Sequence, residues 1–243
     1  MRIGEKIINL ETCDSTNQVA LSEEMQYEPN GTVIISDIQT AGKGRQNRIW
    51  QSPPGGLYLS IILDADRQLN EYNKFAIMTA LAVRETLGKF APDSDFRVKW
   101  PNDVFYFDRK LSGILVQAKT RGEISRVAVG VGVNLNIDWS QYPEHESTAV
   151  SMTRVVGRET DIPRFLNLLL TEIDTSYEVF MAGEFEKLIP RINSVLYSKG
   201  RETEINISGE VRKYLVLGVN PDGTLHVQSP ETGFLDLNIG EIS

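Results

Sequence analysis

Residues 96–133 read FRVKWPNDVFYFDRKLSGILVQAKTRGEISRVAVGVGV and contain four short apolar runs. The runs cover residues 96–99, 104–107, 114–118 and 127–133, and polar turns such as Asp108-Arg109 and Arg121-Gly122-Glu123 separate them. Short apolar runs bounded by turn residues are typical of β-strands. Because turns of this length join antiparallel neighbours, the stretch predicts an antiparallel or mixed sheet.

The segments on the N-terminal side alternate between strand and helix patterns. Residues 57–63 form an apolar run typical of a buried strand, whereas residues 75–90 carry apolar side chains close to helical spacing. Further out, we expect strands at residues 7–10 and 33–35, and a helix that Asp14 or Ser15 caps and that continues to about Met25.

The pattern changes at Asp161. Asp161 caps a predicted helix that continues to residue 180 with Pro163 in its first turn, and a second helix is expected at residues 185–196. From residue 201 short β-type runs alternate with turns, which indicates a small β-barrel.

The composition excludes several classes of protein. With 243 residues, 41% of them apolar, the chain can bury a substantial core. It has no apolar run of roughly 18 residues and no signal-peptide core, so we expect a cytoplasmic protein without membrane contact. The single cysteine excludes an internal disulfide and a Cys-rich metal site, and the net charge of −8 argues against a nucleic-acid binder.

A local cluster of cations stands out against this acidic background. Gly42-Lys43-Gly44-Arg45-Gln46-Asn47-Arg48 places three cations in seven residues, and its glycines let backbone N–H groups approach an anion. Trp50 offers an aromatic face beside it, and Gln39 offers an amide. The segment is therefore either an anion-binding loop or a solvated surface loop, and Trp50 either a stacking residue or a core residue.

A second polar segment interrupts the predicted sheet. Lys99-Trp100-Pro101-Asn102-Asp103 joins two apolar runs where a simple hairpin would prefer Asn-Gly or Asp-Gly. An ordinary Asx turn after the proline explains the same residues. Lys110 precedes Gly113, which would leave room against the strand face, so Lys110 is either a carboxylate-binding cation or a surface lysine.

Five motifs in order carry a family resemblance: Ser15-Thr16-Asn17, residues 42–48 with Trp50, residues 99–103, residues 109–114 and residues 130–136. Over nearly its whole length the chain resembles the biotin protein ligases. The resemblance implies an α/β (α+β) fold of the class II synthetase-like, biotin/lipoate ligase type, with a mixed sheet flanked by helices. It also implies a catalytic domain at residues 1–196 and an SH3-like β-barrel domain at residues 197–243.

The resemblance also implies roles for individual residues. Residues expected to bind biotin are Ser15, Thr16, Asn17, Gln39, Gly42, Lys43, Lys110 and Gly113. Residues expected to bind ATP or the adenylate are Arg45, Gln46, Arg48, Trp50, Lys99, Asn102, Asp103, Gly132 and Asn134. Lys110, Arg45 and Asp103 would be catalytic, and Asp103 would meet Mg²⁺ through ATP.

The implied activity is the ATP-dependent formation of biotinyl-AMP and transfer of biotin to a lysine of a biotin carboxyl carrier protein domain. A homodimer is expected through the sheet edge near residues 130–136. Ser15 lies so near the N-terminus that no DNA-binding domain is expected, and no DNA partner. Cys13 is expected to pack rather than to act as a nucleophile.

Two departures from the family loop Gly-Arg-Gly-Arg-x-Gly-Arg are Lys43 and Asn47. Lysine keeps the charge without the planar fork, and asparagine tolerates a left-handed backbone better than most residues. Two other interpretations stay open: a lipoate ligase or octanoyltransferase, which shares the fold, and a non-catalytic module that senses biotin or its adenylate.

Overall fold

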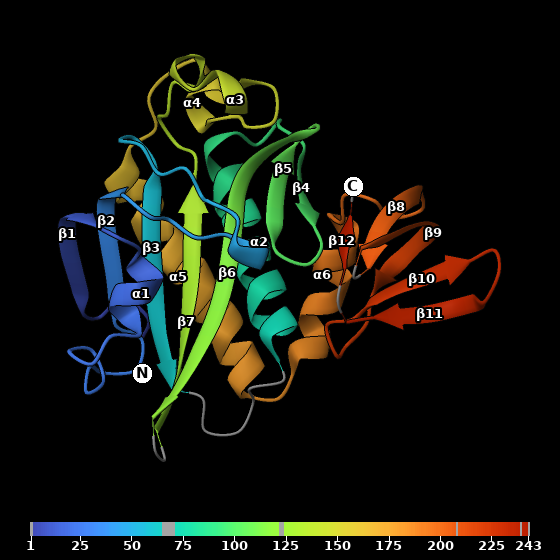
Figure 1. The fold of residues 1–243 in the computed structure, drawn as a ribbon, viewed down its shortest axis with the longest axis horizontal. Coiled ribbons are helices and arrows are strands. Elements are labelled where there is room, and N and C mark those ends of the chain that lie inside the picture. The colour runs from blue at the N-terminus through green and yellow to red at the C-terminus, as the bar shows by residue number, and fades with distance from the viewer. Residues whose placement is uncertain (1, 65–70, 122–123, 208, 239, 243) are drawn as a thin grey trace.

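The computed structural model describes residues 2–64, 71–121, 124–207, 209–238 and 240–242. Within these residues the larger sheet has seven strands in the order β1-β2-β3-β7-β6-β5-β4 (Figure 1). Among the described strands of this sheet, β1 and β2 are the one pair that is parallel. The strands are β1 (Ile7–Cys13), β2 (Val33–Gln39), β3 (Leu57–Asp64), β4 (Phe96–Lys99), β5 (Asp103–Tyr106), β6 (Arg109–Arg121) and β7 (Ile124–Val133).

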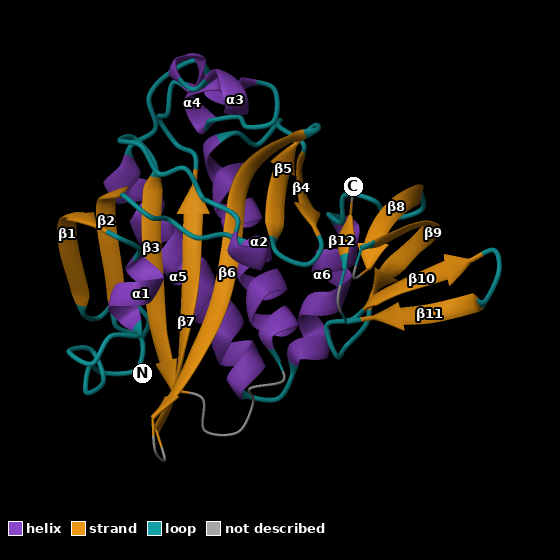
Figure 2. Cartoon of the chain, in the orientation of Figure 1, coloured by secondary structure: helices purple, strands orange, loops and turns teal. Residues whose placement is uncertain are grey.

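Two long helices cover one face of this sheet (Figure 2). They are α2 (Tyr72–Phe90) and α5 (Ile162–Met181), and the rings of Phe75 and Phe180 meet between them with centroids 4.7 Å apart. The Asp161 carboxylate accepts a hydrogen bond from the N–H of Arg164 and so caps α5, as the sequence predicted. Burial of these apolar faces against β3, β6 and β7 forms the main core.

The last strands form a separate antiparallel sheet within the described residues. Its order is β11-β10-β9-β8-β12, and the strands are β8 (Glu202–Ile207), β9 (Glu210–Val219), β10 (Leu225–Ser229), β11 (Gly233–Leu237) and β12 (Glu241–Ile242). The structure therefore confirms a mixed α/β fold with a C-terminal antiparallel sheet. The domain boundary after residue 196 and closure of the small sheet into a barrel stay predictions.

Short helices fill the connections. They are α1 (Thr16–Ala20), α3 (Pro143–Glu146), α4 (Met152–Val156) and α6 (Ile189–Ser194), with single 3₁₀ turns η1 (Arg45–Asn47), η2 (Trp139–Gln141) and η3 (Phe185–Leu188). Among the described residues, no helix combines the length and apolar character that a membrane crossing requires.

The helix predicted from Asp14 or Ser15 to Met25 is wrong in length. The structure ends α1 at Ala20, and turns follow, with the N–H of Ser22 bonded to the carbonyl of Val19. Leu21 and Met25 still pack against the apolar cluster on the outer sheet face, so they are partly buried without a helix. The helix predicted at residues 185–196 is instead η3 followed by α6, with Pro190 in the first turn of α6.

The prediction of a sheet edge near residues 130–136 is also wrong. β7 lies between β3 and β6 and pairs with both, because Val127, Val129, Val131 and Val133 pack into the main core at the middle of the sheet. The sheet ends instead at β1 and β4. Of the predicted turn at residues 121–123, Gly122 and Glu123 lie outside the described residues.

Asn193 in α6 joins the small sheet to the rest of the protein. Its Nδ2 donates to the carbonyl of Val219 (3.1 Å), and its Oδ1 accepts from the N–H of Val219 (2.7 Å). This amide therefore pairs with the end of β9 as a neighbouring strand would.

We expect Asn193→Ala to lower the free energy of unfolding by roughly 1–3 kcal/mol, because it leaves both backbone groups of Val219 without their partner. Urea denaturation measures the change. Asn167→Ala, at an exposed position of α5, is the matched control. Equal stability of the two variants would contradict the linking role of Asn193.

Candidate active site

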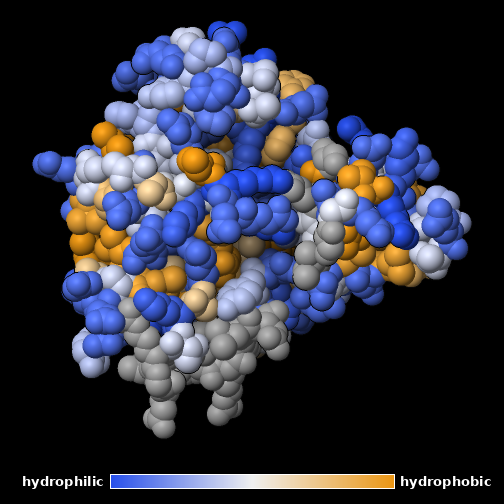
Figure 3. Space-filling model, viewed as in Figure 1, coloured by the Kyte–Doolittle hydropathy of each residue, from blue (hydrophilic) through white to orange (hydrophobic). Residues whose placement is uncertain are grey.

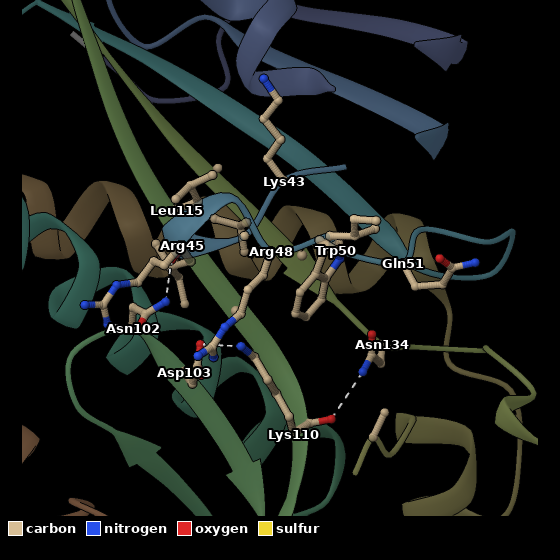
Figure 4. Close-up of a pocket in the computed structure, with 18 of the residues that line it drawn as sticks. Lys43, Arg45, Arg48, Trp50, Gln51, Asn102, Asp103, Lys110, Leu115 and Asn134 are labelled. Carbon is tan, nitrogen blue, oxygen red and sulfur yellow. Dashed lines mark hydrogen bonds and ion pairs between the residues drawn. The ribbon is translucent and has the colours of Figure 1, made fainter. Parts of the chain in front are cut away.

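A pocket of about 430 Å³ opens between the loop after β2 and the strands β6 and β7 (Figure 4). It extends from α1 to Ile242 of the small sheet. Every residue predicted for the biotin and adenylate sites lines it except Gly42, which lies buried behind the loop. The structure thus brings together side chains separated by more than one hundred residues in the chain.

The cationic loop folds back on itself like a small hairpin. The N–H of Gly44 donates to the carbonyl of Arg48 (2.7 Å), and the N–H of Trp50 donates to the carbonyl of Gly42 (2.9 Å). Gln46 and Asn47 at its tip have φ of 54° and 61°. The left-handed backbone at Asn47 confirms why asparagine is accepted there; the same conformation at Gln46 was not predicted.

Arg45 reaches across the pocket to two other parts of the chain. Its Nη1 donates to Oδ1 of Asn102 (3.0 Å), and its Nη2 donates to the carbonyl of Gly240 (3.3 Å). The loop, the 99–103 segment and the small sheet therefore meet at one guanidinium. These contacts indicate that Arg45 is an anchored cation rather than part of a solvated surface loop.

Lys110 and Asp103 form an ion pair in the pocket wall, with Nζ and Oδ1 2.7 Å apart (Figure 4). The Lys110 ammonium also lies 5.2 Å from the centre of the Trp50 ring. Both side chains of the pair are partly exposed to the pocket. Lys110 is therefore a held cation at the centre of the site and not a lysine in a surface turn.

The Trp50 ring lies directly on the backbones of two neighbouring strands. A Cβ on Gly113 of β6 would come within 2.9 Å of the ring, and one on Gly132 of β7 within 2.6 Å. No larger residue fits at either position without moving the indole. The indole Nε1 is buried and has no hydrogen-bond partner among the described residues.

Two asparagines position the backbone around this centre. Asn102 donates through Nδ2 to the carbonyl of Ile114 (2.8 Å), and Asn134 donates through Nδ2 to the carbonyl of Lys110 (3.2 Å). Oδ1 of Asn134 is buried and has no partner among the described residues, which leaves an acceptor for a ligand.

Lys99 lies over two aromatic rings beside the pocket. Its Nζ is 4.7 Å from the ring centre of Phe105 and 5.7 Å from that of Tyr197. The Tyr197 hydroxyl donates to Oδ1 of Asp108 (2.5 Å). Burial and the bond to this carboxylate raise the pKa of Tyr197 to about 12.

The other end of the pocket is lined by uncharged polar groups. The N–H and Oγ1 of Thr16 both donate to Oε1 of Gln39 (2.9 and 3.1 Å). Oδ1 of Asn17 lies 2.6 Å from Oγ of Ser60, and its Nδ2 donates to the carbonyl of Leu115 (3.1 Å). Such a set of amides and hydroxyls suits a neutral head group with both donors and acceptors.

Several pocket residues were not predicted. Gly130 could have been predicted from the sequence, because it lies two positions before Gly132 and so on the same face of β7. A Cβ on Gly130 would approach Oδ1 of Asn17 to 2.4 Å. Others come from distant parts of the chain without a motif, and these are Trp139, His145, Thr148, Ala149 and Ile242.

The two ends of the pocket are chemically different. Amides and hydroxyls of Thr16, Asn17 and Gln39 lie at α1. Figure 4 shows Arg45, Arg48 and Lys110 together at the other end, and Lys43 extending away from them. The site therefore suits a ligand with a neutral polar head and an anionic tail. Among the described residues, no group of three or more His, Cys, Asp or Glu side chains forms a metal site of protein ligands alone.

Comparisons with known proteins agree with this chemistry. The biotin protein ligase of Aquifex aeolicus, solved in complex with biotin and ATP, has 26% sequence identity and a TM-score of 0.84, with 98% of each chain covered. The bifunctional ligase/repressor BirA of Escherichia coli is 35% identical over 196 residues, which are 78% of this chain and 58% of BirA. The biotin–[acetyl-CoA-carboxylase] ligase of Paracoccus denitrificans is 32% identical over 160 residues, or 64% of this chain and 66% of the relative.

The family model described as the biotin/lipoate A/B protein ligase family matches residues 10–134, which is more than half of the chain. The matched region holds the cationic loop, the 99–103 segment, Lys110 and Gly132, and thus most of the pocket wall described above. The chain belongs to the biotin/lipoate A/B protein ligase family.

Proposed function

We propose that the protein is a biotin protein ligase that forms biotinyl-AMP from biotin and ATP and transfers the biotin to a lysine of a carrier domain. The observation that carries the proposal is the single pocket with a neutral polar end and a cationic end. The Aquifex aeolicus relative that covers the same length binds biotin and ATP. A neutral ureido ring suits the end lined by Thr16 and Gln39, and the carboxylate and phosphates suit the end lined by Lys110 and Arg45.

The reaction consists of two displacements. The biotin carboxylate attacks the α-phosphorus of ATP and pyrophosphate leaves; the acceptor amine then attacks the carbonyl of the mixed anhydride and AMP leaves. Neither step needs a nucleophile from the enzyme. The protein contributes positioning and fixed positive charge, and Lys110 and Arg45 are held where negative charge would gather.

The biotin site in this proposal comprises Ser15, Thr16, Asn17, Gln39, Gly42, Lys43, Lys110 and Gly113. The adenylate site comprises Arg45, Gln46, Arg48, Trp50, Lys99, Asn102, Asp103, Gly132 and Asn134. What supports both sets is that all but Gly42 line one pocket.

Mg²⁺ fits the site as an ion carried by ATP. Asp103 is a carboxylate in the pocket wall, and one carboxylate together with substrate phosphates is a common magnesium environment. The ion would neutralise phosphate charge when bound. Asp103 itself holds Lys110 in place.

The acceptor is a biotin carboxyl carrier protein domain, and the Paracoccus denitrificans relative is named for such a substrate, acetyl-CoA carboxylase. We propose a cytoplasmic location from the use of ATP and the single free cysteine. The acidic net charge supports a protein without a DNA partner.

We also propose a homodimer. Side chains on the outer sheet face and α1 are only partly buried, among them Ile8, Leu10 and Val19, and Figure 3 shows hydrophobic residues over β1–β3. β1 is the free end of the sheet on that side. Sedimentation velocity of the purified protein tests this association.

The proposed activity predicts coupled products. Incubation with biotin, MgATP and a carrier domain is expected to release AMP and to label one carrier lysine in equal amounts, measured by chromatography and mass spectrometry. Tight biotin binding without AMP would instead establish a sensor, and lipoate transfer without biotin transfer would establish a lipoate ligase.

Arg45→Gly is expected to let the adenylate escape, because it removes charge-assisted hydrogen bonds at the cationic end. Labelling of lysines on an added bystander protein should rise roughly tenfold, as the loss of about 1.4 kcal/mol of adenylate binding implies. Arg158→Gly, at an exposed turn, is the control. Bystander labelling at the wild-type level would contradict the retention role.

Lys110→Gln is expected to lower kcat for AMP formation by about 10²-fold, since a fixed cation beside developing negative charge contributes on that order. Lys119→Gln lies on the same strand at an exposed position and should leave kcat unchanged. Pre-steady-state measurement of biotinyl-AMP separates this step from transfer. A variant with a raised KM for biotin and an unchanged kcat would limit Lys110 to ground-state binding.

A further inference from the structure

Ser52 lies behind the pocket and has no part in the assignments above. Its side chain is buried, with 4% exposure. Its Oγ accepts a hydrogen bond from Nε2 of Gln39 (2.8 Å) and donates one to the carbonyl of Trp50 (3.0 Å). Ser52 does not line the pocket, whereas Gln39 does.

The hydrogen bonds around Gln39 allow one orientation of its amide. The backbone N–H of Thr16 is only a donor and lies 2.9 Å from Oε1, so the oxygen must face Thr16. Nε2 must then face Ser52. A hydroxyl has one proton, and the Trp50 carbonyl takes it, so Oγ of Ser52 is left as the acceptor that Nε2 needs.

The surrounding space keeps these groups in contact. A Cβ on Gly42 would lie 2.4 Å from the Trp50 carbonyl oxygen, 2.7 Å from Oγ of Ser52 and 3.1 Å from Nε2 of Gln39. The backbones of Gln39 and Ser52 also form an antiparallel bridge. The hydrogen-bonded set is therefore enclosed on the side away from the pocket. Ser52 bonds to the side chain of Gln39 but to Trp50 only through its backbone carbonyl, so Gln39 is the pocket side chain that Ser52 orients.

We propose that Ser52 is a positioning residue for biotin: its hydroxyl fixes the orientation in which Gln39 presents its amide to the head-group end of the pocket. The inference rests on the proposed function and adds to it a residue that makes no contact with the substrate. Without the Ser52 acceptor, Nε2 loses its inner partner and the amide is held only through Oε1 by Thr16, so its plane can tilt, which weakens one specific interaction with biotin.

Ser36 offers a matched control. It is also a buried serine, 1% exposed, and its Oγ also donates to a nearby backbone carbonyl, that of Ile38, at 2.7 Å. It does not line the pocket, and among the described residues none of the side-chain hydrogen bonds of Gln39 is to Ser36. Loss of a buried hydroxyl as such therefore affects Ser36→Ala and Ser52→Ala alike, and loss of amide orientation affects only Ser52→Ala.

The test is calorimetric titration of biotin, and separately of ATP, into five proteins: wild type, Ser52→Ala, Ser36→Ala, Gln39→Met and the Ser52→Ala/Gln39→Met double variant. Ser52→Ala is expected to raise the Kd for biotin about tenfold, equivalent to ~1.4 kcal/mol, and to leave the Kd for ATP within about twofold. The double variant should bind biotin no more weakly than Gln39→Met, because the hydroxyl acts only through that amide.

Three results would overturn the proposal. These are a Kd for biotin in Ser52→Ala equal to that of Ser36→Ala, an equal loss of biotin and ATP affinity, or additive losses in the double variant. Ser52→Thr, which keeps the hydroxyl, should bind biotin more tightly than Ser52→Ala, and it replaces the alanine variant if that one does not fold. Wild-type protein that binds no biotin would overturn the proposed function itself, a result distinct from a failure confined to Ser52.

Discussion

The contact of the Trp50 indole with the bare backbones of Gly113 and Gly132 is the constraint on which the site depends. It requires two adjacent strands, β6 and β7, to carry glycine at facing positions, and the register pairs these two residues directly. The flat strand surface that results lets the cationic loop pack over the sheet. With any Cβ at these positions, Trp50 would move, and the Lys110 ammonium beside its ring would lose that neighbour.

The pocket concentrates positive charge although the protein as a whole is acidic. Arg45, Lys110 and Arg48 line one pocket of a chain with a net charge of −8. Asp103 partners Lys110, and neutral oxygens of Asn102 and Gly240 partner Arg45. The pocket therefore gathers three cations along one wall, which favours an anionic ligand.

Much of the candidate site was predictable because its main residues lie close together in short segments of the sequence. The loop at residues 42–48, the 99–103 segment and the Gly-Val alternation of β7 each carry their chemistry within a few positions, and the structure places all three at one pocket. The errors came from tertiary packing. Leu21 and Met25 are partly buried against the outer sheet face without a helix, and β7 pairs on both sides although its sequence does not reveal its neighbours. Trp139 and Ile242 reach the pocket through long-range folding, which no local motif encodes.

The chain contains three tryptophans, Trp50, Trp100 and Trp139, and all of them border the pocket. They differ in surroundings: Trp50 is beside a cation, Trp100 donates its Nε1–H to the carbonyl of Gly223, and Trp139 lies at an edge-on contact with His145. No indole elsewhere in the protein contributes emission. The tryptophan fluorescence of the unlabelled enzyme is consequently an optical signal of this one site, suited to following ligand entry in real time.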